Sequence, residues 1–145
     1  MTVAVIDTNL PLSALINPHG LPATVVRAWA ERRAFTLATC AYQLHELRTV
    51  SRRPELAKYI KPAQAGRWVN QLQALALVAA EPLPTVDVSS DPFDNFLLGC
   101  AEAIGALYLV SGDKTDVLLL KRHGSTQIVT MRGFARAIRC AKASD

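Results

Sequence analysis

Three aspartates stand at positions that a parallel β-sheet would bring together. Asp7 follows the short apolar run Val3–Ile6, and Asp113 follows a second apolar run, Ala106–Val110. Asp94 lies near the start of a segment with helical periodicity. The carboxyl ends of parallel strands share one edge of a sheet, and ligands bind there in open α/β folds. We therefore expect Asp7 and Asp113 to be neighbours, joined by Asp94 if its helix starts at the same edge.

Carboxylates gathered in this way indicate a hard divalent cation. Like charges a few ångströms apart cannot all ionise comfortably, and a cation removes that cost. Oxygen ligands without His or Cys suit Mg²⁺ or Mn²⁺. Glu46 is a fourth candidate ligand, close to the buried face of its helix, with a solvated helix charge as the alternative. Asp91 and Asp116 are further candidates, each with helix capping as its alternative role.

Other catalytic signatures are incomplete. His45–Glu46 begins like the zinc motif H-E-x-x-H, but position 49 is Thr. Gly112–Thr115 resembles a phosphate-binding loop, but Asp113 separates the glycine from the lysine. No serine lies in the G-x-S-x-G pattern of a hydrolase nucleophile. We interpret the three cysteines and three histidines as structural or solvated.

The elements that must position the acids alternate short apolar strands with amphipathic helices, a pattern typical of a parallel sheet flanked by helices. We expect strands at Val3–Ile6, Phe35–Thr39, Leu77–Ala79, Ala106–Val110 and Gln127–Thr130. We expect helices at Pro22–Arg33, Ala41–Val50, Trp68–Ala76, Pro92–Ile104, Thr115–Arg122 and Phe134–Cys140, and a loop over Glu81–Ser90. The predicted fold class is α/β, an α/β/α sandwich with a central parallel sheet of four or five strands.

Composition restricts the class of protein. The 145 residues predict one domain, 1–145, and a chain that is 50% hydrophobic and 19% charged is not intrinsically disordered. The longest apolar run, Ala74–Ala80, is too short to span a membrane, and the N-terminus does not resemble a signal peptide. Cys40, Cys100 and Cys140 are far apart, which predicts reduced thiols in a cytoplasmic protein. A net charge of +4 is compatible with a polyanionic partner.

Four separated motifs carry a resemblance to a known family. The first is VAVIDTNLPLSALINPHGLPATVVRAW, and the second is ELRTVSRRPEL. The third and fourth occur in one run, DPFDNFLLGCAEAIGALYLVSGDKTDVLLL. In this order they resemble PIN-domain proteins, of the kind that form the toxin of a bacterial (VapC-like) toxin–antitoxin pair.

The resemblance implies an Mg²⁺- or Mn²⁺-dependent endoribonuclease that hydrolyses RNA phosphodiester bonds. It also implies a cognate antitoxin protein and a homo-oligomer, expected to be a dimer. The metal-binding and catalytic acids of the family fall on Asp7, Glu46, Asp94 and Asp113. Thr8 corresponds to the hydroxyl residue that hydrogen-bonds within the carboxylate cluster, and Asn9 follows it as a second supporting residue.

Basic residues near these motifs are candidate contacts for the RNA backbone: Arg48, Arg52, Arg53, Lys114 and Arg122. Surface lysines and arginines are also commonly just solvated. A PIN-fold module that binds RNA or a protein without cutting it is the alternative function. A metal-dependent nuclease assay with an Asp-to-Asn variant would distinguish the two.

Overall fold

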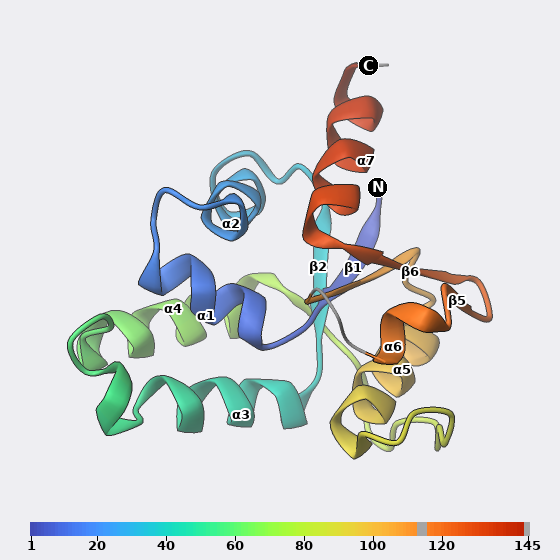
Figure 1. Cartoon of the computed structure of the whole chain (residues 1–145), viewed down its shortest axis with the longest axis horizontal. Coiled ribbons are helices and arrows are strands. Elements are labelled where there is room, and N and C mark those ends of the chain that lie inside the picture. The colour runs from blue at the N-terminus through green and yellow to red at the C-terminus, as the bar shows by residue number, and fades with distance from the viewer. Residues whose placement is uncertain (113–115, 144–145) are drawn as a thin grey trace.

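The computed structural model describes residues 1–112 and 116–143, which form one six-stranded sheet with helices on both faces (Figure 1). The strand order is β3-β2-β1-β4-β6-β5. The strands are β1 (Val3–Ile6), β2 (Thr36–Thr39), β3 (Leu77–Val78), β4 (Tyr108–Ser111), β5 (Arg122–His123) and β6 (Thr126–Thr130). All neighbouring pairs are parallel except β5–β6, which is antiparallel.

The helices of the described residues connect these strands. They are α1 (Asn9–Ile16), α2 (Leu21–Arg32), α3 (Ala41–Ser51), α4 (Pro62–Leu75), α5 (Pro92–Ile104), α6 (Asp116–Leu119) and α7 (Met131–Ala143), with a short 3₁₀ helix at Pro54–Leu56. The predicted α/β class is confirmed. The five parallel strands agree with the predicted parallel sheet of four or five, and a short antiparallel strand, β5, adds a sixth strand at one edge.

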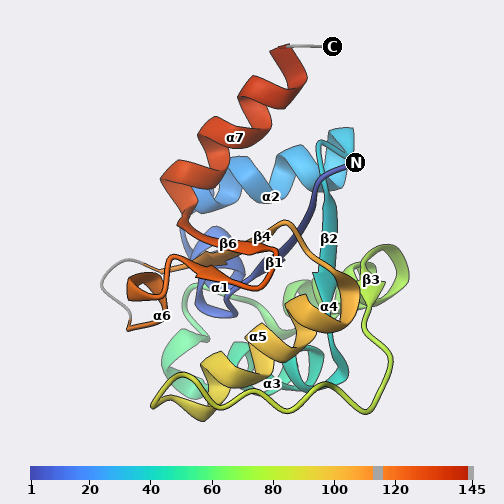
Figure 2. The same cartoon turned by 90° about the vertical axis from the view of Figure 1, so that its right-hand side faces the viewer.

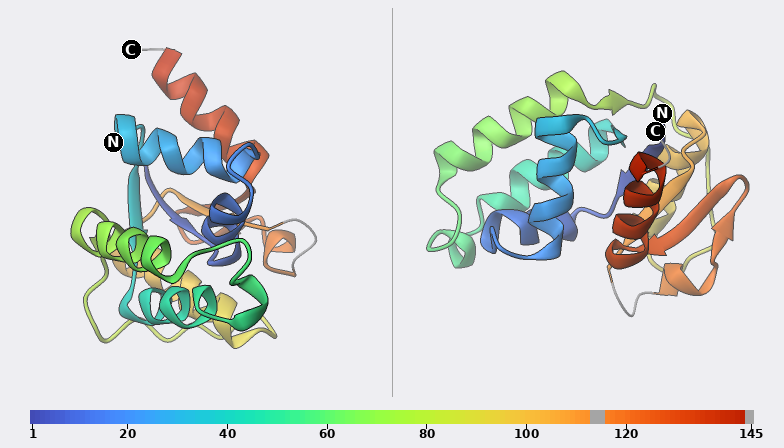
Figure 3. Two further views of the ribbon diagram at one scale, coloured as in Figure 1. Left: turned by 90° about the vertical axis from the view of Figure 1, so that its left-hand side faces the viewer. Right: turned by 90° about the horizontal axis from the view of Figure 1, so that it is seen from above.

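The strands separate two cores because successive side chains point to opposite faces of a sheet. In β1, Ala4 and Ile6 pack with the core that contains residues of α1, α2, α3, α4 and α7, whereas Val5 packs with residues of α5 and α6. Figure 2 shows α5 and α6 on one side of the sheet, and the left panel of Figure 3 shows α1, α3 and α4 on the other. Both faces of β1 are therefore buried, as its uninterrupted apolar sequence predicts.

Local sequence determines where α5 begins and ends. The Asp91 carboxylate accepts a hydrogen bond from the Phe93 N–H at 2.9 Å, so the capping role that the sequence offered for Asp91 is confirmed. Pro92 is the first helical residue, where its missing N–H costs nothing. Gly105 ends the helix with φ of 71°, a left-handed conformation that suits glycine. These signals fix Asp94 in the first turn.

The segment after β4 differs from the sequence prediction. A helix was expected over Thr115–Arg122, but α6 ends at Leu119 and Arg122 begins β5. Lys121 adopts a φ of 59°, which turns the chain back towards the sheet. The β5–β6 hairpin that follows turns at Gly124, with φ of 58°. Positive φ at a lysine is uncommon and has no clear sequence signal.

Candidate functional site

Asp7 lies directly beyond the carboxyl end of β1, at the point where the strand order reverses. β2 and β3 lie on one side of β1, whereas β4 and β6 lie on its other side. The reversal of strand order therefore falls between β1 and β4. The Asp7 N–H donates to the Val110 carbonyl of β4 at 2.8 Å, which places Asp7 beside that strand. Ligands of open α/β sheets bind outside the strand ends at this point.

The Asp7 side chain is buried, with 7% of its surface exposed. The Asn9 N–H donates to its Oδ1 at 3.1 Å, which orients the carboxylate. Burial raises the pKa of Asp7, the Asn9 N–H partly offsets this rise, and the nearby charge of Asp91 adds to it. Among the described residues, no arginine or lysine forms an ion pair with Asp7. Burial therefore disfavours the charged form of this carboxylate.

Asp94 is the second buried carboxylate, also 7% exposed, in the first turn of α5. The Ser89 hydroxyl donates a hydrogen bond to its Oδ2 at 3.2 Å. The influence of Asp91 on Asp7 shows that the start of α5 lies near the end of β1, and α5 packs against β1. The expectation that the Asp94 helix begins at the same sheet edge as Asp7 agrees with this arrangement.

Asn95 holds the loop that carries Ser89. Its Oδ1 accepts hydrogen bonds from the N–H groups of Val88 (3.2 Å) and Ser89 (3.0 Å). Its Nδ2 donates to the Ser89 carbonyl at 3.0 Å. This role was not predicted from the sequence. The sequence signal for this role was the position of Asn95, a side-chain amide next to the first-turn Asp94 and just after the turn-forming residues Ser89–Asp91.

Gln43 is a second polar residue that sequence reasoning missed, and it is 3% exposed. Its Nε2 donates to the Ile6 carbonyl and, at 3.4 Å, to the Thr8 hydroxyl oxygen. The Thr39 hydroxyl donates to its Oε1 at 2.6 Å. Gln43 thereby joins the ends of β1 and β2 to α3 and fixes the chain on both sides of Asp7. An amide within the apolar face of a helix was its sequence signal.

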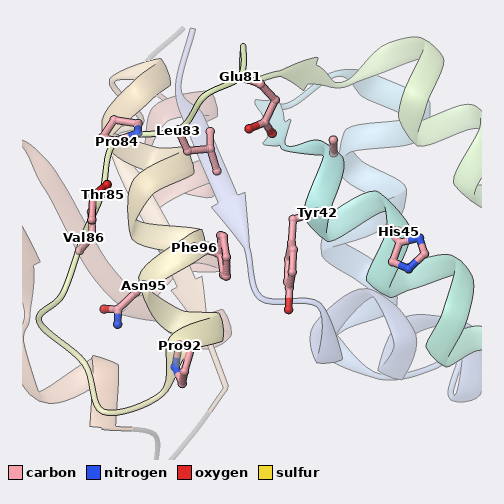
Figure 4. Close-up of a pocket in the computed structure, with 11 residues that line it drawn as sticks. Tyr42, His45, Glu81, Leu83, Pro84, Thr85, Val86, Pro92, Asn95 and Phe96 are labelled. Carbon is pink, nitrogen blue, oxygen red and sulfur yellow. The ribbon is translucent and has the colours of Figure 1, made fainter.

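An apolar groove opens between α3, α5 and the loop that precedes α5, with a volume of about 710 Å³ (Figure 4). The rings of Tyr42 and Phe96 stack in it, with centroids 4.2 Å apart and planes 9° from parallel. Phe93 contacts Tyr42 with ring centroids 5.7 Å apart. Because Phe93 and Phe96 flank Asp94 in sequence, the groove adjoins the first turn of α5.

A comparison with family models matches residues 3–115 to the PIN domain. The chain belongs to the PIN-domain family. Uncharacterized protein MJ1680 of Methanocaldococcus jannaschii is 30% identical over 119 residues, which cover 81% of this chain and 74% of the relative. No solved structure matches the chain. The family expectation from the sequence is confirmed, whereas the archaeal relative gives no support for a toxin.

PIN domains are commonly nucleases, typically use divalent metal ions, and act on nucleic acids. In this PIN domain, Glu46 lies half-buried on α3, one turn after Gln43. Asp113 and Lys114 lie outside the described residues, as does the side chain of Asp116. Within the described part, no three acidic, histidine or cysteine side chains are close enough to hold a metal ion.

The predicted RNA-contacting cations of this PIN domain differ in their surroundings. Arg48 is half-buried, and its Nη2 donates to Gln73 Oε1 of α4 at 2.7 Å, so it also joins two helices. Arg52 and Arg53 are exposed just after α3, and Arg122 is exposed on the edge strand β5. In the described part of the chain, no helix is long and apolar enough to cross a membrane.

Proposed function

We propose that this PIN domain is an endoribonuclease that depends on Mg²⁺ or Mn²⁺. The observation that carries the proposal is the buried carboxylate of Asp7 at the sheet's reversal point, whose pKa is raised chiefly by burial. A charge held in such a position at neutral pH costs free energy unless a cation binds it. A second buried carboxylate, Asp94, stands in the first turn of the adjacent helix.

The donor atoms fit a hard cation. Asp7 and Asp94 supply carboxylate oxygens, and we assign Asp113 and Glu46 as the remaining acids of the site, with Asp91 and Asp116 as outer candidates. Oxygen ligands of this kind bind Mg²⁺ and Mn²⁺ in sites that also hold substrate phosphate. When bound, such a cation neutralises phosphate oxygens and makes an attacking water more acidic.

Hydrogen bonds from neighbouring residues hold Asp7 and Asp94 in place. The Asn9 N–H fixes one oxygen of Asp7, and the Ser89 hydroxyl fixes one oxygen of Asp94. Gln43 holds Thr8 beside the Asp7 backbone. Arg48, Arg52, Arg53, Lys114 and Arg122 are the proposed contacts to the RNA backbone on either side of the cleaved bond.

The activity is tested by RNA cleavage with and without a chelator. Asp7→Asn and Asp94→Asn should each lower the cleavage rate by about a hundredfold or more, because each replaces a metal-binding carboxylate with a neutral amide. EDTA should abolish wild-type cleavage. Asp87→Asn, at an exposed position in the loop that precedes α5, serves as the matched control. Cleavage that is equally fast in EDTA would exclude the metal-dependent mechanism. RNA binding without cleavage would identify a non-catalytic binding module.

The proposal includes a biological role as the toxin of a type II toxin–antitoxin pair in the cytoplasm, acting as a dimer neutralised by a cognate antitoxin. The order of the four sequence motifs supports this role. Expression of the wild-type chain in a bacterial host should then arrest growth, and expression of Asp7→Asn should not. Normal growth with active, soluble wild-type enzyme would contradict the toxin role while leaving the nuclease proposal in place.

A further inference from the structure

Three arginines outside the candidate site share one exposed face of α7. Arg132, Arg136 and Arg139 are spaced by four and then three residues, which places their side chains on the same side of a helix. All three are exposed, whereas Phe134 and Ile138 point from the other side of α7 into the core. The arginines span roughly 10 Å of the helix. We call this stripe the α7 arginine face.

Arg32, at the end of α2, adds a fourth cation beside the α7 arginine face. Arg32 and Arg139 line the same small cavity between α2 and α7, which has a volume of about 250 Å³. Glu31 is the one acidic residue in the sequences of α2 and α7. In the described part of the chain, neither Arg32 nor any arginine of this face forms a hydrogen bond or an ion pair. The surface is therefore basic, and its charges are not neutralised by the described residues.

The energetics of the helix itself do not account for this arrangement. Arg132 is the second residue of α7, where the positive end of the helix dipole disfavours a cation. Like charges three or four residues apart repel one another on a helix surface, so the charge of Arg136 is repelled from both sides. A bound polyanion would remove these penalties. A basic stripe along one helix is also the pattern by which proteins bind nucleic acids without reading the bases.

The α7 arginine face begins at the edge of the sheet that carries Asp7. Arg132 lines a cavity of about 340 Å³ together with Ser111 and Gly112, at the carboxyl end of β4. The Asp7 N–H is hydrogen-bonded to the same strand. Figure 2 shows α7 rising from the end of β6 and passing α2 on its way out from the sheet. A strand of RNA on this face would therefore lead outwards from the edge where we place the cleavage site.

We propose that the α7 arginine face binds the phosphate backbone of RNA and guides one end of the strand away from the candidate site. This inference rests on the proposed ribonuclease function, and it adds contacts that the sequence alone did not indicate. Arginine binds phosphate oxygens through its planar, bidentate guanidinium group. Because contacts to phosphate carry no information on the bases, binding to this face should not depend on base sequence.

The test measures RNA binding rather than cleavage. The full chain with Asp7→Asn is titrated in EDTA against fluorescein-labelled oligouridylate, and fluorescence anisotropy is followed between about 50 and 200 mM KCl. The variant that adds Arg132→Gln, Arg136→Gln and Arg139→Gln should bind with a Kd roughly tenfold higher. Its salt slope should be lower by about two, since each phosphate contact to a single strand contributes about 0.7.

A matched control removes the same charge from another part of the surface. Lys58→Gln, Lys61→Gln and Arg67→Gln change three exposed cations in α4 and in the segment just before it. The Kd of this control should stay within about threefold of the parent, with the same salt slope. Should the α7 variant fail to fold, Arg136→Gln alone should still lower the slope by about 0.7, with Lys61→Gln as its control.

Three results would overturn the proposal. Equal losses of affinity in the α7 variant and its control would show that only net charge matters. RNA binding that the α7 variant does not weaken would place the RNA on another face. Binding of the parent to vesicles of phosphatidylserine and phosphatidylcholine, but not to oligouridylate, would assign the face to an anionic membrane.

The outcome for the α7 arginine face is separate from the outcome for catalysis. RNA cleavage by a wild-type protein whose α7 variant still binds RNA normally would contradict this proposal and leave the ribonuclease in place. A selective loss of RNA binding in the α7 variant, together with a wild type that never cleaves RNA, would support the face and contradict the ribonuclease.

Discussion

Replacing Asp7 with Asn should stabilise the metal-free protein at pH 7. The folded-state pKa of Asp7 is raised, mainly by burial, so ionised Asp7 destabilises the fold when the pH lies above that raised value. The penalty is present at neutral pH and fades as the pH falls through the folded pKa towards the unfolded value near 3.8. Asparagine has nearly the same shape but no charge, so the variant does not carry this penalty.

The expected gain follows from two opposing contributions. Each unit by which the folded pKa exceeds the unfolded one corresponds to about 1.4 kcal/mol. The raised folded pKa of Asp7 already contains both contributions, because burial outweighs the hydrogen bond from the Asn9 N–H. Removing the charge should therefore give a net gain in stability. For a chain of this length each kcal/mol gained should raise the melting temperature by about 2–4 °C.

Thermal melts in EDTA and in millimolar MnCl₂, each at pH 7 and pH 4.5, provide the assay. In EDTA the advantage of the variant should shrink on acidification, because the penalty on ionised Asp7 fades as the pH falls through its raised pKa. In MnCl₂ the wild type should gain about 2.7 kcal/mol once the metal reaches a hundred times its dissociation constant, and the variant should gain far less. A variant that is clearly destabilised in EDTA, together with a wild type that does not respond to metal, would refute the reasoning. Asp7 would then serve to accept the Asn9 N–H rather than to bind a cation.

Three further predictions test the surroundings of the site. Gln43→Leu should lower the free energy of unfolding by about 2–4 kcal/mol in urea titrations, because it orphans the buried Thr39 hydroxyl and two further polar atoms. Gly99→Ala should cost about 1–3 kcal/mol, since the new Cβ would lie 2.8 Å from the Pro84 carbonyl oxygen; Gly66→Ala, with open space around it, should be neutral or stabilising. RNA affinity of an inactive variant should decrease with salt with a slope of about two to five released counterions, as a net charge of +4 suggests, and a slope near ten would contradict this.

The arrangement of the sheet was predictable because its signals are local. A short β-branched run such as Val3–Ile6 has few alternatives to a buried parallel strand, and its aspartate neighbour then has a defined place at the strand end. The start of α5 was equally clear, since Asp91 and Pro92 are strong first-turn residues. By contrast, the early end of α6 depends on a positive φ at Lys121, which its residue type does not indicate.

The polar residues that hold the carboxylates could not be predicted in the same way. Gln43 contacts groups that lie 35 and 37 residues away, so its role exists only after β1 and α3 have packed together. Asn95 and Ser89 act through a loop without regular secondary structure, and their hydrogen bonds depend on how that loop lies along α5. The sequence next to such a side chain does not indicate which distant segment it will contact.

The loop that precedes α5 follows this helix rather than extending into solvent (Figure 2). Asn95 holds its end, and the missing side chain of Gly99 allows the Pro84 carbonyl to approach the helix closely. The stretch between these attachments forms a wall of the groove, while Ser89 stays fixed on Asp94. The wall and the acids are thus encoded by separate short segments. Substitutions at a few loop residues can therefore change the shape of the groove without changing the residues that hold Asp94.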